Sequence, residues 1–120
     1  MKTILIADDS ASIRELVEMT LRSAGYDVLK SSDGEHAIQH LDGTPIDLVI
    51  TDLNMPKVCG IELLREIRSR ADYATVPVLL LTTESQAAKK EEAKAAGATG
   101  WIVKPFVPEK LLSVVHKVIR

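Results

Sequence analysis

Three carboxylates and one amine stand where short apolar runs of this sequence end. They are Asp8, Asp9, Asp52 and Lys104, and the runs before them are residues 3–7, 46–51 and 100–103. If these runs are parallel strands of one sheet, their carboxyl ends share one edge, where the charged side chains meet. Carboxylates packed so closely repel one another and lose solvation, which favours a hard divalent cation. An amine that faces them suits a phosphate, so the pattern predicts phosphoryl chemistry on an aspartate.

Alternating strand and helix patterns along the chain position these residues. Strands are expected at 3–7, 26–30, 46–51, 76–81 and 100–103, and helices at 11–24, 34–41, 60–69, 84–96 and 108–119. Such alternation implies right-handed crossovers and a parallel sheet. We therefore predict an α/β fold, doubly wound (βα)5 and flavodoxin-like, with a five-stranded parallel sheet of order 2-1-3-4-5. In that order the first and third strands are neighbours, so Asp8, Asp9 and Asp52 converge where the strand order reverses.

The bulk composition limits the class of protein. A chain of 120 residues with 46% apolar and 27% charged residues is typical of one globular domain, here residues 1–120. The formal net charge of -2 offers no basic excess for binding nucleic acid. No apolar run is as long as a membrane span, and the start lacks the pattern of a signal peptide. Cys59 is the single cysteine, which excludes an internal disulfide. Together these features predict a cytoplasmic protein without membrane insertion.

Each residue type in the pattern has a chemical use. Asp52 can attack a phosphoryl group as a carboxylate nucleophile, and a magnesium ion would offset the clustered negative charge. Thr82, at the end of the fourth strand, and Lys104 can hold the remaining phosphoryl oxygens. The tight loop Asn54-Met55-Pro56 can turn a backbone carbonyl toward the metal.

Taken singly, these residues also fit ordinary structural roles. The Asp8–Asp9 pair can cap a helix, Asp52 can be a solvated loop residue, and Lys104 can be a surface residue. The joint pattern is much harder to obtain by chance, because all of the polar groups fall at strand ends and none interrupts a strand core.

Five motifs, taken in order, give the chain a family resemblance. They are residues 4–10 (Ile-Leu-Ile-Ala-Asp-Asp-Ser), residues 52–56 (Asp-Leu-Asn-Met-Pro), Gly60, residues 78–82 (Val-Leu-Leu-Leu-Thr) and residues 104–106 (Lys-Pro-Phe). In this order and at these spacings they are highly specific, and they extend over essentially the whole chain. The sequence resembles the receiver domain of two-component response regulators, most of all the stand-alone chemotaxis (CheY-like) branch.

The resemblance implies a role for each residue at the predicted phosphoryl site. Asp52 matches the phospho-accepting aspartate, and Lys104 matches the lysine that pairs with it, joined to Pro105 by an expected cis bond. The implied cofactor is Mg²⁺. Its implied ligands are Asp8 (through water), Asp9, Asp52 and the backbone carbonyl of Asn54.

Other matching positions concern switching and loss of the phosphate. Thr82 matches the switch hydroxyl that follows the phosphoryl group, and Trp101 stands where the family mostly has tyrosine, phenylalanine or histidine as a switch aromatic. The indole is larger, so two interpretations stay open: a ring that rotates inward, and a strand aromatic that covers the sheet edge. Asn54 and Glu84 match positions along the route of the attacking water.

The resemblance also implies what the module does. It would accept a phosphoryl group from a sensor histidine kinase onto Asp52 and change the surface made by the helix at 84–96, the strand at 100–103 and the helix at 108–119. The implied partners are that kinase, a phosphatase and a downstream protein such as a flagellar motor switch component. The chain is not expected to be an enzyme beyond self-phosphotransfer and autodephosphorylation. The three histidines, His36, His40 and His116, show no metal-site spacing, and the donor histidine belongs to the kinase.

Alternative interpretations remain at this point. The length favours a stand-alone protein, but a receiver domain cut from a larger response regulator or hybrid kinase would look similar. A haloacid-dehalogenase-type phosphatase needs an aspartate two residues after a nucleophile on the first strand, where this chain has Ser10 and Ala11. A flavodoxin-like cofactor binder needs a loop rich in Ser, Thr and Gly after that strand. The loop here begins Asp8-Asp9-Ser10, whose negative charge would repel phosphate without a metal.

Overall fold

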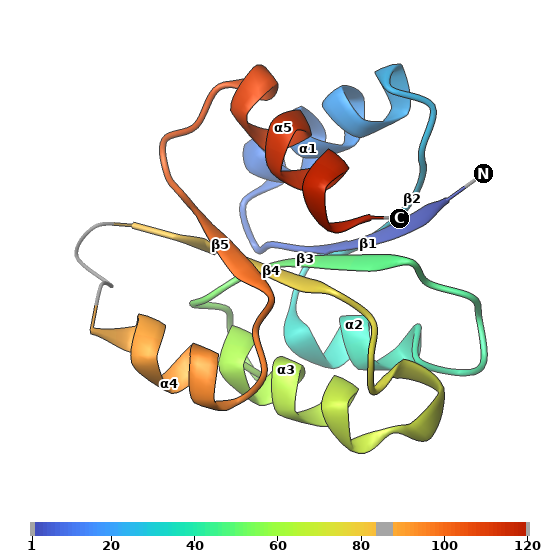
Figure 1. Ribbon diagram of the computed structural model, residues 1–120, viewed down its shortest axis with the longest axis vertical. Coiled ribbons are helices and arrows are strands. Elements are labelled where there is room, and N and C mark those ends of the chain that lie inside the picture. Colours follow the sequence, from blue (N-terminus) through green and yellow to red (C-terminus); the bar gives the residue numbers. More distant parts are fainter. Residues whose placement is uncertain (1, 84–87, 120) are drawn as a thin grey trace.

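Five parallel strands form the central layer of the protein (Figure 1). The computed structural model describes residues 2–83 and 88–119. Within these residues the strands are β1 (Thr3–Ala7), β2 (Asp27–Ser31), β3 (Leu48–Asp52), β4 (Val78–Thr82) and β5 (Gly100–Val103). Their order in the sheet is β2-β1-β3-β4-β5, and every neighbouring pair is parallel. The predicted fold class and strand order are therefore confirmed.

Helices cover both faces of this sheet. In the described ranges they are α1 (Ala11–Ser23), α2 (Gly34–Gln39), α3 (Gly60–Ser69), α4 (Lys89–Ala95) and α5 (Pro108–Val118), with a short 3-10 helix, η1, at Ala71–Tyr73. Figure 1 shows α1 and α5 on one face of the sheet, and α2, α3 and α4 on the other. Among the helices of the described residues, none has both the length and the apolar character needed to cross a membrane.

Several element boundaries differ from those expected. β4 begins at Val78 rather than at residue 76, because Pro77 has no N–H to give to the sheet, although its carbonyl accepts a hydrogen bond from Val49. β2 continues to Ser31, whose carbonyl accepts the N–H of Asp8. α2 ends at Gln39, and η1 was not expected. For α4, the helix begins at Lys89 after a turn at residue 88, and residues 84–87 of the expected helix lie outside the described residues.

Two apolar layers, one on each face of the sheet, hold the helices in place. On one face, strand residues such as Ile4, Ile6 and Leu81 pack with residues of α1 and α5; those helix residues include Val17, Leu21, Leu111 and Val115. Alternate strand residues face the other way and pack with α2 and α3; they include Leu5, Val49 and Val78. All residues of β3 and β4 are buried, as expected for a parallel sheet covered on both faces. The polar side chains of the site are therefore confined to the strand ends.

Gly60 brings the loop after β3 back against the end of that strand. Its N–H donates a hydrogen bond to the Leu53 carbonyl over 2.9 Å. A Cβ atom at Gly60 would press on the Asp52 backbone oxygen and lie 2.9 Å from the Leu53 Cα. Both neighbours are backbone atoms, which cannot yield as the end of a side chain can. The missing side chain at Gly60 therefore helps to place Asp52.

We predict that Gly60→Ala lowers the free energy of unfolding by about 1–3 kcal/mol, the usual cost of forcing extra atoms into a packed site. Gly100→Ala is the matched control, since its added methyl group meets only the Leu79 Cδ2 atom, at 3.3 Å. Chemical denaturation of both variants beside the wild type measures the difference. Equal stability of Gly60→Ala and wild type would contradict the proposed close approach.

Candidate functional site

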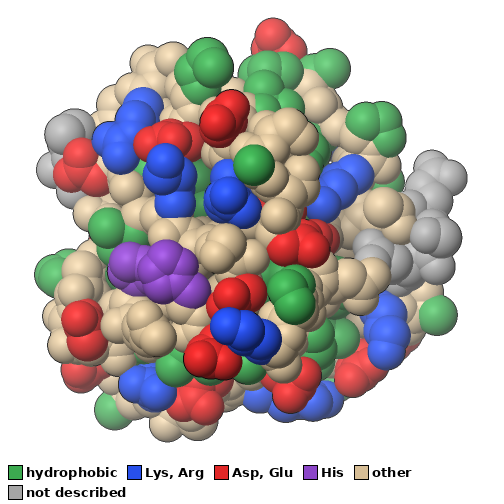
Figure 2. Space-filling model, turned by 180° about the vertical axis from the view of Figure 1, so that it is seen from behind, with side chains coloured by type: hydrophobic (Ala, Val, Ile, Leu, Met, Phe, Trp, Pro, Cys, Tyr) green, Lys and Arg blue, Asp and Glu red, His purple; other side chains and the backbone are tan. Residues whose placement is uncertain are grey.

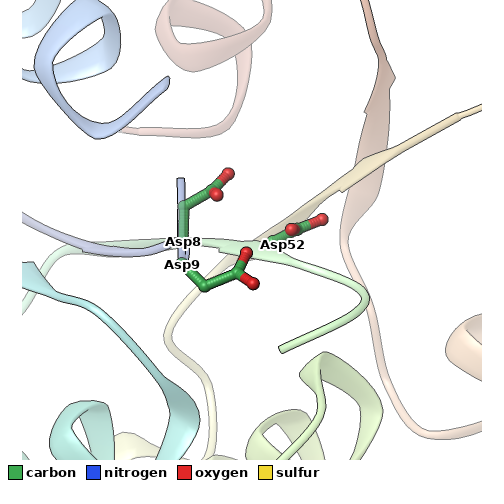
Figure 3. Close-up of side chains that lie close together, drawn as sticks. All are labelled: Asp8, Asp9 and Asp52. Atoms are coloured by element: carbon green, nitrogen blue, oxygen red, sulfur yellow. The ribbon is translucent and has the colours of Figure 1, made fainter. Parts of the chain in front are cut away.

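The three predicted carboxylates meet at the carboxyl ends of β1 and β3. Ala7 pairs with Thr51 across the two strands, so the residues that follow them are neighbours. One ligand atom from each of Asp8, Asp9 and Asp52 lies within 4.8 Å of the other two. Figure 3 shows the three carboxylates leaning to the same side beyond the strand ends. The structure therefore brings together the acidic residues that the sequence placed at one sheet edge.

Every polar atom of Asp8, in the backbone and in the side chain, has a hydrogen-bond partner. It is fully buried, its N–H donates to Ser31, and its backbone oxygen accepts a 2.7 Å hydrogen bond from Arg14 Nη1. Its Oδ1 accepts the Ser10 N–H over 2.9 Å, and its Oδ2 lies 3.3 Å from Lys104 Nζ. Asp9, in contrast, is exposed. The Asp8 side chain is thus held in one position, whereas Asp9 is open to an incoming ligand.

Asp52 combines burial with negative neighbours. It is only 8% exposed, and its Oδ1 accepts the Leu53 N–H over 2.8 Å and lies 3.2 Å from Lys104 Nζ. Burial, followed by repulsion from Asp8, raises the pKa of the Asp52 carboxyl above its ordinary value, and this outweighs the attraction of Lys104. A carboxylate with this surplus of negative charge around it gains stability from an added cation.

Lys104 is the internal counter-ion of the site. Its ammonium group lies within ion-pair distance of both Asp8 and Asp52, and its backbone N–H donates to the Thr82 carbonyl. The bond from Lys104 to Pro105 is cis, as expected. Three carboxylates and one ammonium group leave a formal charge of -2 when all are ionised, and carboxylate oxygens are the ligands that Mg²⁺ prefers. The donor set therefore fits a divalent cation.

Thr82 and Trp101 lie on the neighbouring strands β4 and β5. Thr82 is 2% exposed, and its Oγ1 is a buried atom without a hydrogen-bond partner in the described part of the chain. Such an atom is costly unless a ligand or water completes it. Trp101 is 36% exposed, and Lys90 Nζ lies over its ring, 4.9 Å from the centroid. The indole thus lies partly exposed on β5 beside Lys90 of α4, and its role in switching stays a prediction.

The two other predicted site residues are Asn54 and Glu84. Asn54 is exposed in the loop that follows β3, where a Lys57 φ of 69° and the Gly60 hydrogen bond to Leu53 shape the turn. Glu84, predicted to influence loss of the phosphate, lies outside the described residues.

Comparison with known proteins identifies the family of this chain. Residues 4–116 match the family model of the response regulator receiver domain. The chain belongs to this family. The receiver domain is 37% identical to the chemotaxis protein CheY1 of Helicobacter pylori over 110 residues, which cover 90% of this chain and 89% of that protein. The solved structure of the chemotaxis response regulator CheY4 of Vibrio cholerae superposes with a TM-score of 0.94 at 44% identity, over 99% of both chains.

A longer relative is also similar to the receiver domain. The protein named "Probable transcriptional regulator ycf27" of Porphyridium aerugineum is 38% identical over 117 residues, which are 98% of this chain. These residues make up 48% of that relative, so the receiver domain spans about half of its length.

One residue of this site, Arg14, was not predicted from the sequence. Arg14 donates to the Asp8 backbone oxygen and so fixes the turn that carries both Asp8 and Asp9. A signal was present, because Arg14 stands one helical turn after the capping residue Ser10, and helical side chains point toward the N-terminus. That direction aims a cation from α1 back at the acidic sheet edge.

The raised pKa of Asp52 predicts a pH-dependent gain in stability for Asp52→Asn without metal. The folded protein holds this proton more tightly than the unfolded chain does, so ionised Asp52 lowers the free energy of unfolding. This loss of stability is complete at pH values above the raised pKa of folded Asp52. It disappears as the pH falls below 3.8, the ordinary pKa of an aspartate. Asp52→Asn should therefore be more stable than wild type at neutral pH, with a difference that shrinks on acidification. Chemical denaturation across a pH series, with chelator present, measures it.

Asp42→Asn is the control for this measurement. A hydrogen bond from the Thr44 side chain lowers the pKa of Asp42, so its ionised form stabilises the fold and its removal should bring no gain at neutral pH. A destabilised Asp52→Asn at neutral pH would show that attraction to Lys104 outweighs burial and repulsion from Asp8.

Proposed function

We propose that this receiver domain accepts a phosphoryl group onto Asp52 from the phosphohistidine of a sensor histidine kinase, with Mg²⁺ bound at the acidic edge. The observation that carries the proposal is the setting of Asp52. It is nearly buried, it lies 3.2 Å from Lys104 Nζ, and it converges with Asp8 and Asp9. In the described residues these three form the one group of at least three metal-ligating side chains.

The proposed transfer forms a bond between an Asp52 carboxylate oxygen and phosphorus. The bond from phosphorus to the kinase's imidazole nitrogen breaks, and its electron pair stays on that nitrogen. Mg²⁺, when bound, would polarise the phosphoryl oxygens and offset the negative charge of the group. Its proposed ligands are Asp8 through water, Asp9, Asp52 and the backbone carbonyl of Asn54.

Lys104 and Thr82 are the proposed holders of the transferred group. Lys104 Nζ already lies beside Asp52, so its ammonium group can pair with a phosphoryl oxygen on that residue. Thr82 offers a buried hydroxyl that has no partner in residues 2–83 and 88–119. A phosphoryl oxygen would satisfy this hydroxyl, and the gain would be absent from the unphosphorylated state. That difference between the two states is what a switch requires.

We propose that the switch acts on the surface formed by α4, β5 and α5. Lys104 follows β5 directly, and Trp101 of β5 contacts Lys90 of α4, so movement at the strand ends reaches both elements. Within the described helix α4, only Ala93 is buried, and an alanine buries little apolar area. Weak packing of α4 leaves it free to shift with the phosphorylation state. Asn54 and Glu84 are proposed to line the route of the water that removes the phosphate.

The proposed setting is a cytoplasmic phosphorelay, with chemotaxis as the favoured pathway. The similarity to CheY1 and CheY4 supports this choice. The downstream partner would then be a protein such as a flagellar motor switch component, and a phosphatase would end the signal. We propose no catalysis beyond self-phosphotransfer and autodephosphorylation. The alternative is a receiver domain of a larger response regulator or hybrid kinase, as the length of the ycf27 relative illustrates.

Intact mass spectrometry after incubation with acetyl phosphate and Mg²⁺ tests the proposed chemistry. Wild type should gain the mass of one phosphoryl group, and chelation of the metal should abolish the gain, because the acidic edge would repel the donor. Asp52→Asn should gain nothing, whereas the exposed-site control Asp42→Asn should behave as wild type.

Two results would contradict the proposal. One is a phosphoryl group on Asp52→Asn in the same amount as on wild type. The other is an unmodified wild type after exposure both to acetyl phosphate and to a phosphorylated sensor kinase.

A further inference from the structure

A pair of histidines on the second helix forms a group that the phosphorylation site does not use. His36 and His40 are four residues apart and lie at the last turn and C-cap of α2. Their ring centroids are 5.2 Å apart, with 39° between the ring planes. Figure 2 shows histidine side chains side by side on the surface. The three histidines show no metal-site spacing in the sequence when taken together, yet the helix brings these two into contact.

His40 contains a buried nitrogen, Nε2, that has no hydrogen-bond partner among the described residues. In the described residues, two buried side-chain polar atoms lack a hydrogen-bond partner: Thr82 Oγ1 and His40 Nε2. A buried polar atom without a partner is unfavourable, and native proteins rarely keep one without a ligand, water or functional reason. His36 is exposed, so the pair can be reached from solvent.

The distance between the two rings suits a shared metal ion. A tetrahedral zinc ion that binds one nitrogen of each ring at about 2.0 Å places the two centroids roughly 5 Å apart. Two histidines four residues apart on a helix also form the zinc-binding half of the His-Glu-x-x-His motif. Contact between the two rings alone would give a similar separation, but it would leave His40 Nε2 without a partner in the described part of the chain.

We propose that His36 and His40 bind a divalent transition-metal ion of the Zn²⁺, Ni²⁺ or Cu²⁺ class. Imidazole nitrogen favours these ions, whereas the oxygen ligands at Asp8, Asp9 and Asp52 favour Mg²⁺, so the two sites select different metals. No third His, Cys, Asp or Glu of the described residues joins the pair in a metal-ligating group. The remaining coordination positions are therefore open to water or to a side chain of another protein. This site does not depend on the proposed function of Asp52.

Isothermal titration of the full chain with Zn²⁺ tests the proposal, with excess Mg²⁺ present to occupy the acidic edge. Wild type should bind one Zn²⁺ per chain. His36→Gln and His40→Gln should each bind Zn²⁺ at least about tenfold more weakly. Removal of a residue that only supports a metal ligand already lowers metal affinity by about 10–100-fold, so loss of a ligand itself should cost no less. The matched control is His116→Gln, because His116 lies on α5 and its ring contacts Tyr26 instead. It should bind as wild type does.

A second readout locates the metal. At low concentrations, paramagnetic Ni²⁺ or Cu²⁺ should broaden the NMR amide resonances of α2 more than those of β1 and β3. In His36→Gln, α2 should no longer be broadened first. His36 is exposed, so this variant should fold normally even if His40→Gln does not. Absence of Zn²⁺ binding by wild type would overturn the proposal. So would binding that survives both histidine substitutions but disappears in Asp9→Asn or Cys59→Ser.

Discussion

Repulsion between buried carboxylates is the constraint around which this receiver domain is built. Asp8 and Asp52 are held side by side by the pairing of β1 with β3, and neither can move away because both lie at the ends of fully paired strands. Burying two like charges is expensive unless a counter-charge is supplied. Lys104 supplies one, and its position depends on β5 joining the sheet beyond β4. The strand order therefore places the Lys104 ammonium group where it can offset the negative charge of Asp8 and Asp52.

The charge at the site is only partly balanced, because one ammonium group, that of Lys104, faces three carboxylates. The remaining negative charge makes the site receptive to a divalent cation, and it raises the pKa of Asp52 in the absence of one. The buried Thr82 hydroxyl has no hydrogen-bond partner within the described residues, so a second requirement of the site is an acceptor for this hydroxyl. A phosphoryl group with its metal would meet both requirements at once. The same features that destabilise the resting site would therefore stabilise the phosphorylated one.

Much of this arrangement could be predicted from the sequence, because it depends on where strands end. Apolar runs followed by Asp8, Asp52 and Lys104 were enough to predict the sheet and its acidic edge, since parallel strands bring their carboxyl ends together. The start of β4 was predicted two residues too early, because a single residue, Pro77, decides it. The expected start of α4 lies outside the described residues.

Contacts that depend on side-chain direction could not be predicted in the same way. The hydrogen bond from Arg14 to the Asp8 carbonyl and the position of Lys90 over Trp101 join residues whose spacing carries no strand or helix signal of its own. The contact between His36 and His40 could have been predicted, because residues four apart on a helix are neighbours. Two histidines alone, however, are a weaker sign of a metal site than three converging carboxylates. In each case the backbone fold brought the residues near, and the rotamers decided what they touch.

The most direct test of phosphorylation at Asp52 is a crystal structure of the protein with Mg²⁺ and beryllofluoride, a stable mimic of a phosphoryl group. We expect beryllium to be bonded to an Asp52 carboxylate oxygen, with fluorine atoms in contact with Lys104 Nζ and Thr82 Oγ1. The metal should lie among Asp8, Asp9 and Asp52. A structure in which Asp52 stays unmodified and paired with Lys104, with the metal bound elsewhere, would contradict it.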